Sequence, residues 1–484
     1  MPFSPKLVRI VRRLLISLAV FVTLIALVFV VENWRGDRAW KKYAAEHAAR
    51  GEIFDALPNP STLPPEVNFF KTPVIDRWAY DEKFEDFLIK IAAPNLDSGR
   101  GITKGWTAGR ATDFKRVVEA LKKDRKKPPA QEAVQSAVVT PSAQVLELLA
   151  PMESMLVELR QAARQRPESQ LTRLTQVPRN WGTFHSPNGD FPFAIETALS
   201  LHASASLAEQ HPEIAFEDVM AGLKFSRGFS DAPDAVLIET LVGAALLQQS
   251  LQPIWEGLQH HAWSDDQLAK IQQEITKTDL FYSLDRTFHT ERAMCLDLLE
   301  HLPSRTIASD MREQWIWRSM PHGWIQQNKI SYCVLSAPYF QIVSACGTRD
   351  FLPRLSNIGK YPKGFDRFTA PYTVFASRLL KGMSRLPENI APYQAFRTLA
   401  ETACALERYR LAHGNYPGSL PELVPTYLDK VPLDIINGQP LTYRRTDSGK
   451  FILYSVGLDG KDDGGKPATS DSEGDLAWPQ PVEN

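Results

Sequence analysis

An uncharged apolar run near the N-terminus constrains this chain more than any other feature. Leu14–Val31 spans eighteen residues without a charge, and only Ser17 and Thr23 are polar. A helix of this length is at the lower end of what crosses the hydrocarbon core of a bilayer. Four basic residues come before the run: Lys6, Arg9, Arg12 and Arg13. Because basic flanks stay in the cytoplasm, we expect a single-pass protein of the inner (cytoplasmic) membrane, with a cytoplasmic N-terminus and the bulk of the chain in the periplasm.

A cleaved signal peptide or a buried core helix would also produce such a run. Signal cleavage needs small residues just after the apolar segment, whereas Val30-Val31-Glu32-Asn33-Trp34 contains no such pattern. Trp34 and Trp40 suit the aromatic belt of a membrane interface. Four basic residues also follow the run, which weakens the charge asymmetry: Arg35, Arg38, Lys41 and Lys42. The sequence therefore favours an uncleaved anchor.

Length and composition limit what the rest of the chain can be. With 484 residues, of which 44% are hydrophobic, the chain is long enough for two or three folded units with cores of their own. Its 55 basic and 56 acidic residues exclude a generally basic nucleic-acid-binding protein, so we expect no nucleic-acid partner. Four cysteines are too few for a disulfide-rich scaffold.

Hydrophobic periodicity predicts a mainly α fold in four segments. These are residues 1–34, a cytoplasmic tail and transmembrane helix; 35–140, a juxtamembrane helix, a proline-rich loop and a basic helical region; 141–385, an irregular domain of helical hairpins; and 386–484, a small α+β head. Within the third segment the predicted helices are Ala143–Arg164, Phe193–Glu209, Ile214–Phe229, Ala235–Leu258, Asp265–Thr276 and Leu280–Leu302. Residues 347–370 carry several glycines and prolines and predict a loop.

The last seventy residues or so have a different pattern. A helix over 390–413 should end at Gly414, where a left-handed residue is expected. Ser419 and Glu422 form a capping-box pattern that predicts a short helix through Leu428. Two β-like runs, Leu441–Arg445 and Phe451–Val456, flank the turn residues 447–450 and predict a hairpin.

This C-terminal part resembles the head of type II secretion major pseudopilins. The resemblance is carried by four stretches in the family's order: Leu406–Pro417 with its Gly414-Asn415-Tyr416-Pro417, Leu428–Tyr443 with Asp434, Ser455–Gly460, and Asp475–Trp478. The apolar run departs from the family, since it has no early Glu and no Gly-Phe cleavage junction. A pseudopilin-like head reused in a larger anchored protein fits these residues better than a pilus subunit. The plan from Asn33-Trp34-Arg35-Gly36 to this head also resembles single-pass membrane proteins of Verrucomicrobia-like bacteria.

The loop 457–475 is the best candidate site. It contains six carboxylates against two lysines, and hard oxygen ligands on a glycine-rich loop suit Ca²⁺. The resemblance implies a Ca²⁺ site in this loop, with Asp459 and Asp475 at the family's carboxylate positions and Asp471 placed to join them. A solvated acidic turn without metal is the alternative.

Other patterns are weaker. His260-His261 is adjacent in sequence and unsuited to one shared metal; Cys333 and Cys346 are the only cysteines close enough in sequence to suggest a bridge; and the basic run 115–127 could touch lipid head groups or form a solvated helix face. No zinc-protease, nucleophile-elbow, Walker or dinucleotide motif occurs. We therefore expect a non-catalytic, membrane-anchored envelope protein whose partners are the lipid bilayer and other envelope proteins. A type II secretion-like component, or an extracytoplasmic enzyme with no recognisable motif, are the alternatives.

Overall fold

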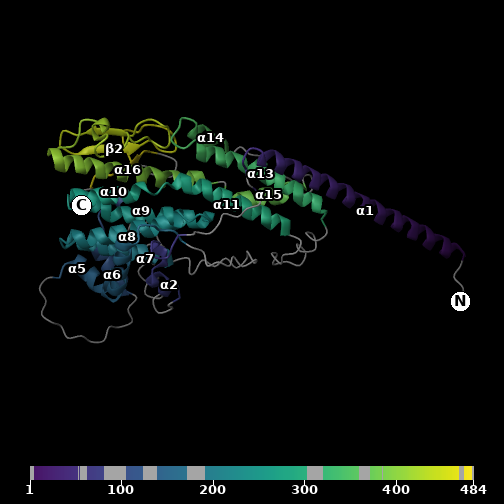
Figure 1. Cartoon of the computed structure of the whole chain (residues 1–484), viewed down its shortest axis with the longest axis horizontal. Coiled ribbons are helices and arrows are strands. Elements are labelled where there is room, and N and C mark those ends of the chain that lie inside the picture. Colours follow the sequence, from purple (N-terminus) through teal and green to yellow (C-terminus); the bar gives the residue numbers. More distant parts are fainter. Residues whose placement is uncertain are drawn as a thin grey trace.

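The chain folds into a helical body with one long apolar helix at its N-terminus and a small sheet near its C-terminus (Figure 1). This computed structural model describes residues 5–52, 54, 63–80, 105–123, 139–171, 191–301, 320–358, 371–383, 385–467 and 474–481. The predicted mainly α class and the long apolar helix are therefore confirmed.

The described residues form α-helices, 3-10 helices and three strands. The α-helices are α1 (Pro5–Ala48), α2 (Pro73–Tyr80), α4 (Phe114–Lys123), α5 (Pro141–Leu149), α6 (Glu153–Gln165), α7 (Phe191–Ala208), α8 (Pro212–Ser230), α9 (Leu237–Gln259), α10 (Asp265–Thr276), α11 (Leu280–His301), α13 (His322–Ser344), α14 (Phe351–Ile358), α15 (Val374–Leu379) and α16 (Leu386–His413). The 3-10 helices are η1 (Phe69–Lys71), η3 (Trp106–Ala108), η4 (Ala150–Met152), η7 (Leu380–Gly382) and η8 (Leu420–Leu423), and the strands are β1 (Thr442–Arg445), β2 (Phe451–Ser455) and β3 (Leu476–Ala477).

Local sequence signals explain many of these boundaries. Ser264 and Gln267 form the predicted capping box at the start of α10, with Gln267 N 3.3 Å from Ser264 Oγ. Gly414 ends α16 in the left-handed conformation, as expected. Three predictions were wrong. The single helix expected over Ala143–Arg164 is divided into α5 and α6 by the 3-10 turn η4, which contains Pro151. The expected loop contains α14, which accommodates Pro353 because a first-turn residue needs no N–H partner, and the expected helix through Leu428 is only the short turn η8.

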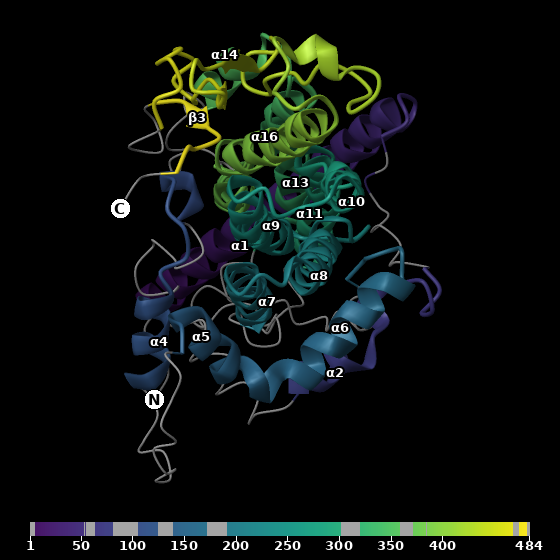
Figure 2. The same cartoon turned by 90° about the vertical axis from the view of Figure 1, so that its left-hand side faces the viewer.

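The helices stack in layers, seen end-on in Figure 2. From one side to the other, α5 and α6 cover α7 and α8, which pack on α9, α10 and α11; α16 comes next, and the sheet covers it. One buried hydrophobic cluster runs through α9, α10, α11, α13 and α16 into the strands. A second cluster fills the space among α5, α6, α7 and α8.

Helix α16 is buried on two sides. Leu399, Ala403 and Leu406 belong to the core that it shares with α9 and α10, while β2 and β3 pack on it from the other side. The C-terminal segment returns to this core: Trp255 Nε1 donates to Pro479 O at 3.0 Å, and the Trp478 ring lies 5.4 Å from that of Trp106. The head and the body therefore share one hydrophobic interior.

The sheet has the antiparallel order β1-β2-β3. Thr442 pairs with Tyr454 and Arg445 with Phe451, so β1 and β2 form the hairpin that the sequence predicts. Strand β3 pairs through Leu476 with Ser455. The acidic loop is consequently the connection between β2 and β3.

Helix α1 continues without a break from the apolar run into the body, where it packs against α13. At the crossing, a Cβ atom on Gly323 would lie 1.8 Å from Glu32 O, and one on Gly36 would lie 2.3 Å from Gly323 Cα. Only glycine fits at either position, and the two backbones are in direct contact.

Polar side chains of α1 complete this crossing. Asn33 Oδ1 accepts a hydrogen bond from Gly323 N at 3.0 Å, so a side chain of one helix satisfies a free N–H in the first turn of another. Glu32 Oε2 accepts from Trp324 Nε1 at 3.0 Å and from the Tyr372 hydroxyl at 2.9 Å. Its negative charge also suits the positive end of the α13 dipole.

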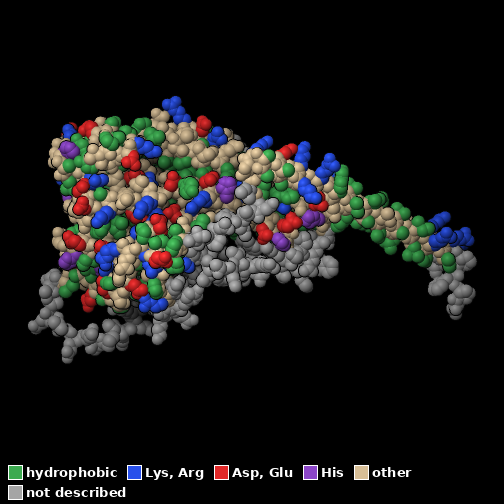
Figure 3. Space-filling model, in the orientation of Figure 1, with side chains coloured by type: hydrophobic (Ala, Val, Ile, Leu, Met, Phe, Trp, Pro, Cys, Tyr) green, Lys and Arg blue, Asp and Glu red, His purple; other side chains and the backbone are tan. Residues whose placement is uncertain are grey.

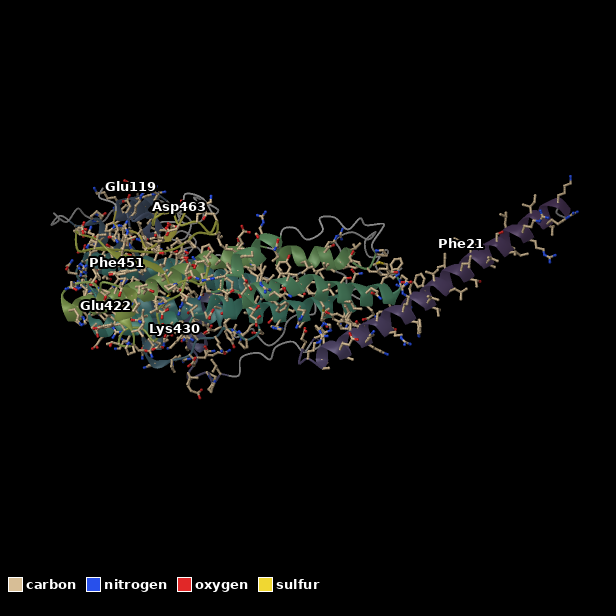
Figure 4. All side chains as sticks on the ribbon, turned by 90° about the horizontal axis from the view of Figure 1, so that it is seen from above. Phe21, Glu119, Glu422, Lys430, Phe451 and Asp463 are labelled. Atoms are coloured by element: carbon tan, nitrogen blue, oxygen red, sulfur yellow. The ribbon has the colours of Figure 1, made fainter. Side chains whose placement is uncertain are left out.

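The apolar run lies outside the body. Val8–Ala48 is long and apolar enough to cross a membrane, and its most apolar window is not buried. In Figure 3 a hydrophobic band separates the basic side chains near the N-terminus from those where the helix meets the body. Phe451 of the head lies at the opposite end of the molecule from Phe21 of the run (Figure 4).

A glycine-to-alanine substitution, which adds one methyl group, tests the α1–α13 crossing. We expect Gly323→Ala to lower the free energy of unfolding by about 1–3 kcal/mol, because overpacking outweighs the better helix propensity of alanine. The matched control is Gly382→Ala, whose Cβ would meet only Leu237 Cδ1 at 3.7 Å and which should change stability by less than about 0.5 kcal/mol. Chemical denaturation in detergent measures both variants. A Gly323→Ala protein as stable as the wild type would contradict the contact.

Candidate functional site

The acidic loop leaves β2 and returns to β3 through a tight backbone contact. A Cβ atom on Gly457 would lie 1.9 Å from Gly474 O and 3.5 Å from Asp459 Oδ1. Only glycine allows this approach, which brings Asp459 near the residue that precedes Asp475. The structure thus places two of the three predicted ligands on neighbouring parts of one turn. Asp471, the third, lies outside the described residues.

Asp475 is fully buried and organises the loop. Its Oδ2 accepts hydrogen bonds from Asp463 N at 3.0 Å and Gly465 N at 2.7 Å. Its Oδ1 is buried and has no hydrogen-bond partner among the described residues. Burial raises the pKa of Asp475, and the two backbone N–H groups oppose that shift.

The neighbouring carboxylates are engaged locally. Asp459 Oδ1 accepts from Lys461 N at 3.1 Å, and Asp462 Oδ1 accepts from the Tyr454 hydroxyl at 2.8 Å. Among the described residues, no group of three or more His, Cys, Asp or Glu side chains is arranged to hold a metal ion. A cation at this loop would therefore use the free oxygen of Asp475, Asp459, backbone carbonyls and ligands beyond the described residues.

Other residues of the pseudopilin-like motifs have structural contacts. Asp434 accepts from Ile436 N, the Ser455 hydroxyl and Val456 N at 2.7–2.8 Å, which ties the turn after η8 to the end of β2. The buried Glu407 accepts from the Tyr416 hydroxyl at 2.8 Å and from Arg410 Nη2 at 2.7 Å.

Glu407 also contacts one member of the adjacent histidine pair His260-His261. His261 Nδ1 lies 2.7 Å from Glu407 Oε1, so the residue after α9 is fixed to the end of α16. The expectation that His260 and His261 share no metal stays a prediction.

The helical body also contains a buried charged cluster that the sequence did not predict. Arg160 Nε donates to Asp218 Oδ1 at 2.6 Å and Arg160 Nη1 to Glu153 Oε1 at 2.8 Å, while His202 Nδ1 lies 2.8 Å from Asp218 Oδ2. The same nitrogen also lies 3.0 Å from Arg160 Nη2, so it faces both a guanidinium donor and a carboxylate acceptor. Ser206 Oγ lies 3.4 Å from the same nitrogen. The cluster joins α6, α7 and α8 through ion pairs.

Glu196 is a second buried group that the sequence analysis missed. It lies among α7, α8 and α9, where Ser250 Oγ donates to its Oε1 at 2.5 Å and Ser200 Oγ at 3.3 Å. Its Oε2 has no partner among the described residues. A Cβ on Gly222 would lie 2.7 Å from Oε1, so α8 packs directly on the carboxyl group. Burial raises the pKa of Glu196 to about 7.

The structure also places the cysteines and the basic helix that the sequence analysis singled out. All four cysteines are free: Cys333 lies inside the unbroken helix α13, and Cys346 follows the end of that helix. Burial raises the pKa of Cys333 to about 12. The basic helix α4 lies at the far end of the molecule from the apolar run, as the labels Glu119 and Phe21 show in Figure 4, so the lysines of α4 are out of reach of a bilayer around α1. Residues 124–127 of the basic run lie outside the described residues.

The environment of Glu196 predicts a pH dependence. Because its folded-state pKa is raised above the unfolded value, its contribution to stability is present below about pH 4.5 and is lost as pH rises to about 7. The Glu196→Gln variant cannot ionise at this position. We expect its free energy of unfolding, relative to that of the wild type, to rise by roughly 3 kcal/mol between about pH 4.5 and about pH 7. Denaturant titrations at both pH values measure this gain. The exposed Glu147→Gln on α5 is the control, and an equal Glu196→Gln effect at both pH values would contradict the prediction.

The comparisons with known proteins found no match. No protein-family model, no curated protein and no solved structure matches it. The function has to be inferred from the residues and contacts described above.

Proposed function

We propose that this protein is a non-catalytic, membrane-anchored envelope protein of the inner membrane. Its helical body lies in the periplasm and binds other envelope proteins, and its pseudopilin-like head presents a contact surface that Ca²⁺ stabilises. The observation that carries this proposal is the placement of the head: it lies at the opposite end of the molecule from the apolar helix (Figure 4).

Continuity of α1 supports an anchor that is kept. A signal peptide is removed at an accessible, small-residue site after its apolar segment. Here the residues after the run, Glu32 and Asn33, are still helical and hold α13 and Tyr372 through hydrogen bonds. The same residues give the body a fixed attachment at the membrane.

A non-catalytic role is supported by how the polar clusters are used. The carboxylates of Asp218, Asp434 and Glu407 each bond to two or more groups of the protein. A general base or nucleophile needs an atom that faces the substrate. These groups instead connect separate elements, which suits a scaffold that displays a surface.

The Ca²⁺ part of the proposal depends on Asp475. Its buried Oδ1 has no hydrogen-bond partner among the described residues, and the loss of hydration without a replacement costs free energy. A cation bound to that oxygen would remove this cost and join the loop to the end of β3. The carboxylate of Asp459 would share the charge.

Orientation in the membrane tests the anchored arrangement. Lys450→Cys, on the exposed hairpin turn, should react with a membrane-impermeant thiol reagent in cells stripped of their outer membrane. The native thiols should react slowly, since burial raises the pKa of Cys295 and Cys333 to about 12. Ser4→Cys, before the apolar run, is the control and should react only after lysis. The reverse labelling pattern would contradict the proposed orientation. A photoreactive group attached to Lys450→Cys tests the contact surface, and the absence of any protein adduct in intact cells would contradict the proposed binding of other envelope proteins.

Thermal unfolding of the full chain with Ca²⁺, Mg²⁺ or chelator tests the loop. The full chain is needed because α16 shares its core with α9 and α10. A Ca²⁺ concentration a hundredfold above Kd should stabilise the fold by about 2.7 kcal/mol, and Mg²⁺ should act weakly because it holds its waters. Asp475→Asn can still accept both backbone hydrogen bonds but should lose the response, whereas Asp447→Asn on the hairpin turn should keep it. Equal unfolding with Ca²⁺ and chelator would leave only a solvated acidic turn.

A further inference from the structure

The part of α1 just beyond the apolar run has two opposite faces. One face, with Glu32, Asn33 and Gly36, docks on α13. The other is exposed and carries the residues that we call the juxtamembrane stripe: Trp34, Arg35, Arg38, Lys41 and Lys42. At 100° per residue these five side chains fall within about one third of the helix circumference. Tyr372 lies at one edge of the stripe, with its ring centroid 5.8 Å from Arg35 Cζ.

The charge of the stripe is only partly neutralised. Arg35 Nη1 lies 3.0 Å from Glu32 Oε1, and Lys42 Nζ lies 3.8 Å from Glu46 Oε1. Arg38 lies over the Trp34 ring, 5.7 Å from its centroid. Neither Arg38 nor Lys41 has a carboxylate partner among the described residues. The stripe is therefore a net positive surface with an aromatic ring at its membrane end.

The stripe begins where the apolar run stops. With a rise of 1.5 Å per residue, Arg35 lies ~6 Å and Lys42 ~17 Å beyond Val31 along the helix. A head-group layer is about 5–8 Å thick on each side of the hydrocarbon core. Trp34 and Arg35 fall inside this layer, and Arg38 can reach it by extending its side chain towards the phosphates. Lys41 and Lys42 lie about 7–12 Å beyond its outer edge, a distance comparable to the Debye length of ~8 Å.

We propose that the juxtamembrane stripe binds the phosphate groups of anionic phospholipids in the leaflet that faces the body. This inference rests on the proposed anchor and adds a specific ligand class to it. Charge complementarity and continuity with the apolar run favour lipid over a protein partner, because the stripe starts inside the head-group layer. Since the glycine contact with α13 fixes the rotation of α1 about its own axis relative to the body, lipid bound on one face of α1 also sets which side of the body lies nearest to the membrane.

Lipid selectivity of the reconstituted full chain tests the stripe. The association of spin-labelled phosphatidylglycerol is compared with that of spin-labelled phosphatidylcholine in vesicles that contain both lipids. The test variant is Arg35→Gln/Arg38→Gln/Lys41→Gln/Lys42→Gln, and the matched control is Lys430→Gln/Arg444→Gln/Lys450→Gln/Lys461→Gln on exposed positions of the head. A basic residue near an anionic surface contributes about fivefold, so the loss of two unpaired charges should lower the preference for phosphatidylglycerol by up to about 25-fold.

Several outcomes distinguish a failure of lipid binding by the stripe from a failure of the proposed anchor. Arg35→Lys/Arg38→Lys keeps the charge and should keep most of the preference, and added salt should weaken it in the wild type. A stripe variant with unchanged selectivity, or a control variant that loses as much, would overturn the inference while leaving the anchor intact. Release of the wild-type chain from vesicles by an alkaline wash would contradict the anchor, and the inference with it.

Discussion

The backbone contact between Gly36 and Gly323 is the constraint on which the placement of the body depends. Because neither position has room for a side chain, α1 and α13 approach closely enough for Asn33 to cap α13 and for Glu32 to bind Trp324. Many anchored domains hang from flexible linkers whose length sets their reach. In this chain α1, the helix that could cross a membrane, packs directly on α13. The orientation of the body relative to α1 is therefore fixed.

Helix α16 has a comparable role at the other end. It supplies one face to α9 and α10 and the other to the sheet, so the head cannot be separated without exposing a core. The residues that resemble pseudopilins hold this arrangement together: Glu407 binds Tyr416, and Asp434 binds Ser455.

Much of the fold could be predicted because it is encoded locally. Amphipathic periodicity and capping residues locate α7 to α11 within a few residues, and turn residues locate the β1–β2 hairpin. Contacts between distant residues could not be predicted in the same way. Asn33 meets Gly323 across 290 positions, and Arg160 meets Asp218 across 58. A polar Asp218 on the buried face of α8 was the available signal, but it does not identify its partner. For the acidic loop, the resemblance placed Asp459 and Asp475 near one turn, whereas the burial of Asp475 came only from the structure.

The return of the C-terminus to the core has a consequence for biogenesis. Trp255 binds the carbonyl of Pro479, 224 residues later, and Trp478 packs near Trp106. If the chain emerges across the membrane from its N-terminus onwards, α9 and α16 must wait for the last residues before their common interior is closed to water. Such late, long-range closure leaves apolar helices exposed during export. Under the proposed topology, the core around α9 and α16 would close only after the segment around Trp478 has crossed the membrane, and the helices that form it would have to be kept from aggregating until then.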